Sequence, residues 1–432
     1  MLSKSDNKHI NTKPNFFISA GPLLLVLLID GMGLGLVFPI MNGLIFDPHS
    51  GFLPTSLLTP TMQNVIYGSI VGIFMLCWFF GAAILGDLSD KIGRKKSLQI
   101  CLFGAFLSYV LSAIAVITHS LTLLIIGRVI AGLTSGSQPI AQAAIIDLSE
   151  EEHKTRNIGY ILLSLSIGFI IGPLLGGLLS DNSIVSWFNF SIPFVFAAVL
   201  SLINMGLLWW LFNETFTAQH TSLVINPYLA LDIFVSAFQN LEIRNLSIIF
   251  FIFILGWSSF YSFIAMFLLK LYQFTPTQVS LYMAAMGVGF GIGNGYLSNF
   301  FAKRFPLNTN TIVSLFISSL MILLVSVVHN VILCWIMIIP IATTVSIAYT
   351  SILTIFSNQV SLDKQGWVMG VSGSILAFVF GVDGILVGII AAWSDTLPIL
   401  IAAVCIFIAG IVSYFFQPAE RLKTNEIRVN IH

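Results

Sequence analysis

Twelve long apolar runs fill most of this chain of 432 residues and leave few folds open to it. A helix needs about 20 mostly apolar residues to cross the hydrocarbon core of a bilayer. Charged residues make up only 8% of the chain, whereas soluble domains carry roughly 25%. We therefore expect an all-α membrane protein with twelve transmembrane helices. The expected spans are 17–42, 62–86, 98–117, 121–147, 158–179, 187–212, 246–271, 278–301, 311–328, 331–357, 368–393 and 397–416.

The distribution of basic residues supports an even number of spans. Twelve spans place both termini on one side of the membrane, and every Lys and Arg except Arg128 and Lys270 then falls in a tail or loop on that side. Loops rich in Lys and Arg face the cytoplasm. We therefore expect cytoplasmic tails at 1–16 and 418–432. We also expect a cytoplasmic central segment at 213–245, with an amphipathic part that lies along the membrane surface.

The first and second sets of six spans share short sequence patterns at one offset. GDLSDKIGRK at 86–95 aligns with GYLSNFFAKR at 295–304, and the same offset brings Gly172 onto Gly381. Internal repeats of this kind occur in secondary transporters, which move one half against the other around a site near the bilayer midplane. The repeat therefore predicts two pseudo-symmetric six-helix halves. These halves are 17–212 and 246–417.

The loop between the second and third spans carries the most specific motif in the chain. GDLSDKIGRKKSL resembles the signature G-x-L-x-D-x-x-G-R-K of the major facilitator superfamily, and the chain resembles the twelve-helix drug:proton antiporters that include the tetracycline exporters. The resemblance implies the major facilitator fold. An acid and several bases in such a turn can form ion pairs that hold one access state shut, although basic residues here also fix topology. The predicted gating residues of this loop are Gly86, Asp90, Gly93, Arg94 and Lys95; Leu88 also matches the signature.

Two further stretches resemble motifs of this superfamily. DLSEEEHKTR carries Asp147 and Arg156, which resemble a second cytoplasmic charge pair with a gating role; the alternative is a solvated loop. GFIIGPLLGG in the fifth span is similar to the antiporter motif, in which small residues let helices touch and a proline bends the helix. The alternative is ordinary close packing, but the resemblance favours export over import. The residues of this motif are Gly168, Gly172, Pro173, Gly176 and Gly177.

An acid lies in the middle of the first span, within LLLVLLIDGMGLGLVFP. A charged Asp at the centre of a membrane helix costs about 2.5–3.5 kcal/mol, so such a residue is a candidate functional site. DGMGLGLVFP resembles the pattern D-x-x-G-x-G-x-x-x-P of tetracycline-type exporters at Asp30, Gly33, Gly35 and Pro39. A carboxylate in a low-dielectric environment is protonated more readily than one in water. Asp30 is therefore predicted to exchange protons in competition with a cationic substrate.

Two more charged residues are predicted to take part in proton coupling. Asp383, in the eleventh span, departs from the usual exporter sequence and is predicted to be a second protonation site, a cation contact or a structural partner of a helix end. LLIIGRVIAGLTSG resembles the motif of the fourth span through Leu124, Arg128 and Gly132, with Thr134 in place of a usual glycine. Arg128 is predicted either to join the coupling site or to extend to the outer interface.

Candidate substrate residues are polar or amphipathic side chains within the spans, although aromatic residues in membrane helices more often pack or anchor at the interface. These candidates are Gln142, Trp257, Tyr261, Asn294 and Tyr349. The four cysteines lie inside apolar runs without a CxxC pair or a Cys/His cluster, so we expect no metal site. With a net charge of +0 and no basic patch interleaved with aromatic residues, we expect no nucleic-acid partner.

These features predict a secondary active transporter. The leading hypothesis is a proton-coupled antiporter that exports small organic or drug-like compounds by alternating access, as a multi-pass monomer in a bacterial inner membrane. Its expected partners are the substrate, protons and lipid, with the proton gradient as energy source and no cofactor. The alternative is a siderophore or metabolite transporter of the same fold, working as importer or exporter.

Other protein classes are less consistent with the motifs. An intramembrane aspartyl protease would also need two acids, but the contexts LIDG and GVDG lack its Y-D and G-x-G-D patterns. The chain has no HExxH, GxSxG or P-loop motif, which disfavours a membrane hydrolase or an ATP-driven pump. We therefore expect that the protein is not an enzyme. A receptor or structural subunit that does not transport would have little need of the loop and fifth-span motifs.

Overall fold

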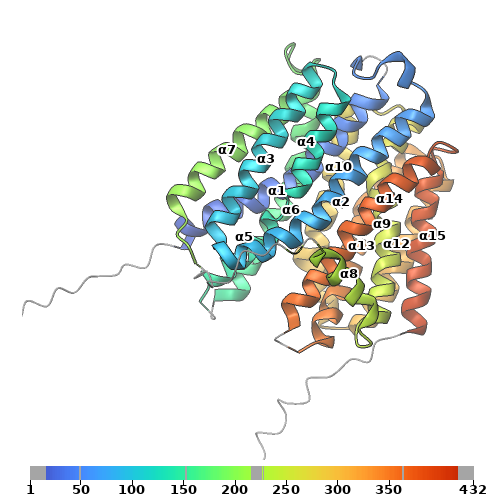
Figure 1. Cartoon of the computed structure of the whole chain (residues 1–432). Helices are drawn as coiled ribbons and strands as arrows, with labels where there is room; N and C mark the ends of the chain where they lie inside the picture. The colour runs from blue at the N-terminus through green and yellow to red at the C-terminus, as the bar shows by residue number, and fades with distance from the viewer. Residues whose placement is uncertain are drawn as a thin grey trace, which may run out of the picture.

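The computed structural model describes residues 16–47, 50–150, 153–215, 226, 228–361 and 364–416. The predicted tail at 418–432 lies outside these residues, as does the predicted tail at 1–16 apart from its last residue. In the described part of the chain, long helices pack side by side into a bundle without any strand (Figure 1). The expected all-α membrane fold is confirmed. The first helix begins and the last helix ends at the same end of this bundle (Figure 1).

Most helices follow the expected spans. Eleven helical segments in the described part of the chain are long and apolar enough to cross a membrane, when α4 and α5, within Leu121–Asp147, are counted together as one segment. They and the shorter helices are α1 (Phe16–Phe46), α2 (Pro60–Ile92), α3 (Arg94–Ile117), α4 (Leu121–Leu133), α5 (Ser137–Asp147), α6 (Lys154–Ser180), α7 (Ile192–Leu211), α8 (Leu229–Gln239), α9 (Arg244–Tyr272), α10 (Pro276–Ile292), α11 (Ser298–Ala302), α12 (Leu307–Val327), α13 (Val331–Gln359), α14 (Gln365–Ile390) and α15 (Leu397–Phe415).

Two expected spans are irregular. The span predicted at 278–301 is helical throughout, but a π-helical turn, Gly293–Leu297, separates α10 from α11 and leaves α10 with 17 residues. The span predicted at 121–147 is split into α4 and α5 by a turn at 134–136. Local interruptions of this kind are often found at functional sites.

Several helices begin where the sequence supplies a cap. The side chain of Thr59 accepts a hydrogen bond from the backbone at the start of α2, where Pro60 occupies the first turn. Thr275 and Gln278 form a capping box at the start of α10. These side chains satisfy backbone N–H groups that the first turn of a helix leaves unpaired.

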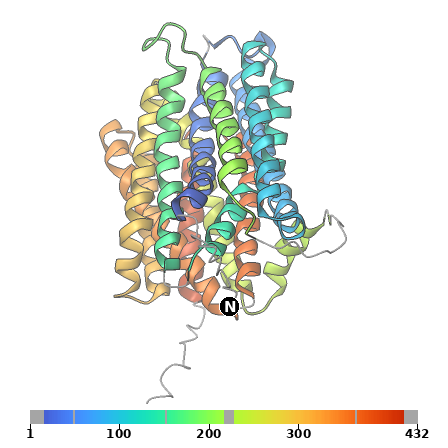
Figure 2. The ribbon, with the colours of Figure 1, turned by 90° about the vertical axis from the view of Figure 1, so that its left-hand side faces the viewer.

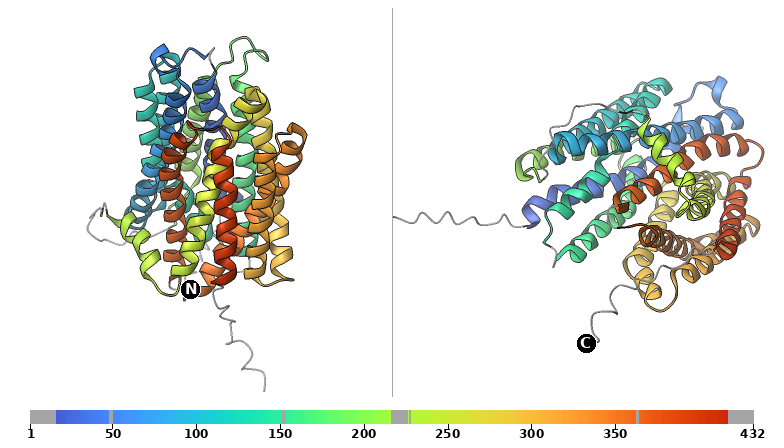
Figure 3. Two further views of the ribbon diagram at one scale, coloured as in Figure 1. Left: turned by 90° about the vertical axis from the view of Figure 1, so that its right-hand side faces the viewer. Right: turned by 60° about the horizontal axis from the view of Figure 1, so that its bottom comes forward.

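The bundle has two halves, which Figure 1 shows in blue to green and in yellow to red. Helices α1 to α7 form the first half and α9 to α15 the second; Figure 3 shows them side by side when the lower end of the molecule is tilted toward the viewer. Pairs α2 with α14 and α6 with α10 join the halves. Glycines let these helices touch: a Cβ atom on Gly72 would lie 2.6 Å from the carbonyl oxygen of Gly381.

The fifth-span motif brings α6 against α1 and α10. A Cβ atom on Gly168 would lie 2.5 Å from the carbonyl oxygen of Leu28 in α1, and the Pro173 ring packs against Gly35. Gly172 and Gly176 also face the backbone of α1, whereas Gly177 faces Ser280 of α10. The motif therefore lies at a close contact within the first half and reaches the second half through Gly177. Helix α6 continues through Pro173 to Ser180.

Hydrogen bonds between the halves gather at the end of the bundle that carries Lys270, which we call the Lys270 end. The Lys270 ammonium donates to the side chain of Asn64 at 2.9 Å and to Asp395 at 2.9 Å. The hydroxyl of Tyr67 donates to the carbonyl oxygen of Ser262 at 2.7 Å. The bonds that involve Asn64 and Tyr67 join α2 to α9 and hold the halves together at this end, whereas Asp395 lies in the same half as Lys270.

Helix α8 lies at the opposite end, which carries Arg94 and is called the Arg94 end (Figure 2). Its Phe234 ring packs against Phe79 of α2 and Phe378 of α14, with ring centroids 6.1 and 4.5 Å away. Leu231 and Val235 are exposed on its other face. A helix is therefore present in the segment that was expected to be amphipathic, and it packs against both halves.

Candidate functional site

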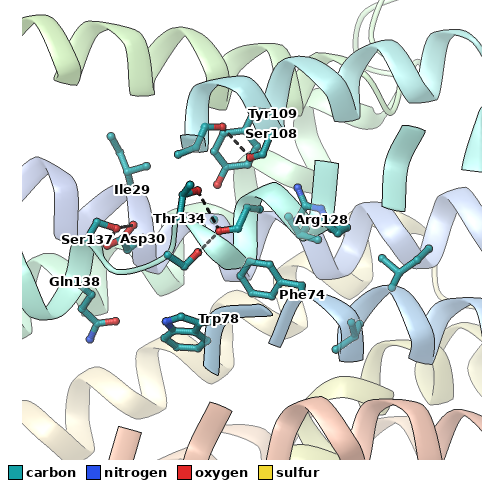
Figure 4. Close-up of a pocket in the computed structure, with 17 residues that line it drawn as sticks. Ile29, Asp30, Phe74, Trp78, Ser108, Tyr109, Arg128, Thr134, Ser137 and Gln138 are labelled. Atoms are coloured by element: carbon teal, nitrogen blue, oxygen red, sulfur yellow. Dashed lines mark hydrogen bonds between the residues drawn. The ribbon is translucent and has the colours of Figure 1, made fainter. Parts of the chain in front are cut away.

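A cavity of about 90 Å³ lies inside the first half, between α1, α2, α3, α4 and α5 (Figure 4). It has room for several water molecules, whereas pockets for drug-sized ligands measure roughly 300–1,000 Å³. Phe74 and Trp78 form an aromatic wall. The polar lining residues are Asp30, Ser108, Tyr109, Arg128, Thr134, Ser135, Ser137 and Gln138.

The break in the fourth span places the N-terminus of α5 beside this cavity. The hydroxyl of Thr134 donates to the carbonyl oxygen of Ile130 at 2.8 Å, and that of Ser135 donates to Ala131 at 2.6 Å. Such side-chain bonds compete with the helical backbone pattern. Gly136 then packs against Leu85, and α5 starts at Ser137. The predicted span at 121–147 is confirmed. The break within it was not predicted, because a hydropathy window does not register a Thr-Ser-Gly turn.

Asp30 faces the start of α5. The hydroxyl of Ser137 donates to both oxygens of the Asp30 carboxyl group, at 2.9 and 2.8 Å. Ser137 is the first residue of α5, and the positive end of a helix dipole favours a negative charge. The acid predicted from the first span therefore lies in a polar cavity beside a helix N-terminus.

Arg128 lines the same cavity and does not extend to the outer interface. Its side chain is 3% exposed and lies over the rings of Phe74 and Phe194, at 5.8 and 5.9 Å from the ring centroids. Its Nη2 donates to the hydroxyl of Ser112 at 3.2 Å, and its Nε has no hydrogen-bond partner in the described part of the chain. Cation–π contacts therefore provide much of the stabilisation of this guanidinium.

Asp383 lies outside the cavity, in the second half. It is 1% exposed, and one carboxyl oxygen accepts a hydrogen bond from the hydroxyl of Ser259 in α9 at 2.8 Å. The hydroxyl of Ser258 also adjoins this carboxyl group. The next residue, Gly384, packs against Gly68 of α2, so Asp383 adjoins the contact between the halves. Asp30 and Asp383 do not line one cavity.

The loop motif forms a charge cluster at the Arg94 end. Arg94 lies 2.8 Å from the carboxylate of Asp90 and 3.6 Å from that of Asp147. The backbone N–H groups of Arg94 and Lys95 donate to the carboxylate of Glu214 at 2.9 and 3.0 Å. Gly93 has a φ of 100°, which side chains disfavour, and a Cβ atom there would meet Glu214. These bonds connect α2, α3, α5 and the end of α7, all within the first half.

The structure adds three details of this cluster to the sequence prediction. The partner of Asp147 is Arg94 and not the predicted Arg156, which is exposed on α6. A Cβ atom on Gly86 would meet no neighbouring helix within 4 Å, so close packing does not explain this glycine. Glu214 was missed, because its role depends on a contact 120 residues away along the chain.

The predicted substrate residues do not line the cavity. Gln138 lies there instead of Gln142, one helical turn away. Trp257 and Tyr261 pack in an aromatic cluster with rings 5.9 Å apart, near the contact between the halves. Asn294 accepts a hydrogen bond from Thr350 at 3.0 Å, and the Tyr349 ring packs 5.8 Å from Phe250. Sequence reasoning also missed Tyr109 and Ser137, since only the fold brings them to Asp30.

Comparisons with known proteins agree with this architecture. The family model described as Major Facilitator Superfamily matches residues 23–384. The chain is 35% identical over 196 residues to the class H tetracycline resistance protein of Pasteurella multocida, a match that spans 45% of this chain and 44% of that protein. It is 24% identical over 400 residues to the quinolone resistance protein NorA of Staphylococcus aureus, 91% of this chain and 95% of that protein.

A solved structure supports the same fold. A bacterial homolog of the human lysosomal transporter Spinster, in an inward-facing and unoccupied conformation, aligns with a TM-score of 0.70 at 15% identity, over 94% of this chain and all of that one. At this identity the likeness concerns the fold alone. The matches and the long apolar helices together identify an integral, multi-pass membrane protein.

Proposed function

The chain belongs to the major facilitator superfamily, and on that premise we propose that it is a proton-coupled antiporter that exports small organic, drug-like compounds across a bacterial inner membrane. The observation that carries the proposal is the pairing of Asp30 with Ser137 at the start of a half-helix inside a polar cavity. An acid in this position can take up a proton without facing lipid. The resistance proteins that the chain resembles support export of drug-like compounds.

The mechanism follows from competition at one site. A cationic substrate near Asp30 favours the ionised carboxylate, and a proton on Asp30 weakens the attraction for that substrate. Each ligand therefore lowers the affinity for the other. The Arg94 end faces the cytoplasm in this proposal, because basic residues concentrate there. The structure then corresponds to a state that is held closed on the outer side by the bonds of Lys270 and Tyr67.

Substrate transport requires that the halves separate at the Lys270 end. The cavity of about 90 Å³ is too small for a drug, so the substrate site in this proposal widens between the halves during the cycle. Rocking of one half against the other would provide that space. The glycine contacts of α2 with α14 and of α6 with α10 are the surfaces along which the halves would move.

A second candidate function is transport of an anionic metabolite or siderophore. Arg128 favours it, because this guanidinium lines the cavity and no carboxylate of the described residues lies within ion-pair distance. A buried cation without an ion-pair partner can attract an anionic group. In that case Arg128 would bind the substrate and Asp30 would keep the coupling role.

Proteoliposomes with an imposed pH gradient test both candidates. Tetraphenylphosphonium, tetracycline and a ferric siderophore are added in turn, and proton movement is recorded for wild type, Asp30→Asn and the control Asp232→Asn, which changes an exposed acid on α8. Proton flux driven by a cation or drug in wild type and in Asp232→Asn, but not in Asp30→Asn, supports the antiporter. Flux driven only by the siderophore supports the second candidate. Flux that survives in Asp30→Asn contradicts coupling at Asp30.

A further inference from the structure

Tyr109 of α3 faces the cavity and approaches α1. Its side chain is 8% exposed, and its hydroxyl points at α1 one turn after Asp30. A Cβ atom on Gly33 would lie 2.5 Å from the Tyr109 hydroxyl oxygen but 3.8 Å from the ring carbon that carries it. Only the hydroxyl group therefore requires glycine at position 33.

The same hydroxyl lies between the two charges of the cavity. Figure 4 shows Tyr109 with Asp30 on one side and Arg128 on the other. Tyr109 interacts electrostatically with both of them. Its hydroxyl makes no hydrogen bond to another described residue and is not sealed from the cavity. The thiol of Cys101 on α3 also interacts with Asp30.

We propose that Tyr109 is a positioning residue of the coupling site, whose hydroxyl links the carboxyl group of Asp30 to the guanidinium of Arg128 across the cavity. Gly33 then serves to admit this hydroxyl. The proposal rests on Asp30 as the proton-coupling residue. Gly33 is the glycine that follows three residues after the acid in this chain.

The physical basis is that a tyrosine hydroxyl both donates and accepts hydrogen bonds. It can donate toward the carboxylate and accept from the guanidinium through water in the cavity. Removal of a proton from Asp30 would then alter the surroundings of Arg128. A phenylalanine at position 109 would fill the same space and break this link.

A double-mutant cycle tests the steric part of the proposal. Thermal unfolding is measured for wild type, Gly33→Ala, Tyr109→Phe and the double variant. Gly33→Ala is expected to lower the unfolding temperature, because the new methyl group collides with the hydroxyl. The double variant is expected to recover the value of Tyr109→Phe, since the remaining 3.8 Å contact is ordinary. Additive effects in the cycle would overturn this part.

Infrared spectroscopy tests the positioning role without any substrate. The band of the protonated carboxyl group of Asp30 is identified by its loss in Asp30→Asn and followed as a function of pH. Tyr109→Phe is expected to shift the midpoint of that band by about one pH unit, a tenfold change in proton affinity. The control Tyr282→Phe, which changes a buried tyrosine of the second half bonded to Cys334, is expected to leave it unchanged.

A measurement of substrate-driven proton flux is the third test. Tyr109→Phe is expected to lower the proton flux driven by tetraphenylphosphonium or tetracycline about tenfold, the effect of one charge-assisted hydrogen bond. A wild-type band midpoint and a wild-type flux in Tyr109→Phe would overturn the proposal. If Asp30→Asn still shows substrate-driven proton flux, the proposed function itself is wrong. If Asp30→Asn loses this flux but Tyr109→Phe keeps the wild-type flux and band midpoint, only the role of Tyr109 is wrong.

Discussion

Each half of the molecule holds one acid inside the membrane, and the two acids differ in their surroundings. Asp30 lies in a polar cavity with Arg128, and a hydroxyl bonds to both of its carboxyl oxygens. Asp383 is 1% exposed beside the contact between the halves, where the hydroxyls of Ser259 and Ser258 adjoin its carboxyl group. Water can reach the first acid through a cavity, whereas packing surrounds the second.

This difference teaches that depth in the membrane does not by itself define a coupling residue. A proton carrier needs a path to water and a nearby group that responds to its charge. Asp30 has both features. A change in the charge of Asp383 would instead affect the packing of α14 against α2. We therefore expect Asp30 to govern proton coupling and Asp383 to govern the stability of the closed state.

The largest difference in proton flux is expected between the two variants in which one of these acids is replaced by its amide. Asp30→Asn should lower substrate-driven proton flux by at least about 100-fold, because the group that carries the proton is lost. Asp383→Asn should keep most of that flux, since its carboxyl group lies outside the cavity. Proteoliposome assays on both variants check this. Equal losses would show that the two acids act as one unit and would break the comparison.

The next effect concerns the glycine contact beside Asp383. Gly72→Val adds a side chain where a Cβ atom would lie 2.6 Å from the carbonyl oxygen of Gly381. Overpacking of this kind costs about 1–3 kcal/mol. We expect a lower unfolding temperature and greater separation of the halves, measured by thermal unfolding and by distances between spin labels. Gly366→Val on α14 serves as control, because a Cβ atom there would meet no neighbouring helix within 4 Å. Equal unfolding temperatures in the two variants would contradict close packing here.

A smaller effect is expected from the two serines that bond to the acids. Ser137→Ala and Ser259→Ala each remove a hydroxyl that donates to a carboxyl group, and a hydrogen bond of this kind is worth about 1.5–3 kcal/mol if that group is charged. Ser137→Ala should reduce proton flux, whereas Ser259→Ala should mainly lower the unfolding temperature. Flux and unfolding measured on the same preparations separate these outcomes. The reverse assignment would mean that the coupling site is in the second half.

The smallest effect is a pH response at the Lys270 end. Hydrogen bonds from Ser183 and from Thr277 of the other half hold the pKa of Asp181 below its ordinary value. The ionised Asp181 carboxylate therefore stabilises the closed state at any pH above the ordinary pKa of about 3.9. This stabilisation is lost as the pH falls through the lowered pKa of Asp181. Spin labels at positions 184 and 281 should move apart only at such acid pH. Thr277→Val should weaken this response, and an unchanged response would exclude Asp181 as its source.

The sequence was sufficient for the features that depend on local composition. Apolar runs located the spans, and an isolated acid in such a run identified Asp30. The break in the fourth span was missed because its signal, a Thr-Ser-Gly turn, is weak beside the hydropathy of the flanking residues. Tyr109 and Glu214 were missed for a different reason. Tyr109 meets Gly33 across 76 residues of the chain and Glu214 meets Arg94 across 120, and no periodicity or spacing in one sequence reports such contacts.

Helix α5 connects the cavity to the charge cluster at the Arg94 end. It carries Ser137, bonded to Asp30, at one end and Asp147, paired with Arg94, at the other. An α-helix rises 1.5 Å per residue, so these eleven residues form a stiff rod of about 16 Å. A rod transmits a displacement without shortening. The acid in the membrane interior and the arginine at the surface are thus connected by one stiff helix. We expect a displacement of either end of α5 to displace the other end.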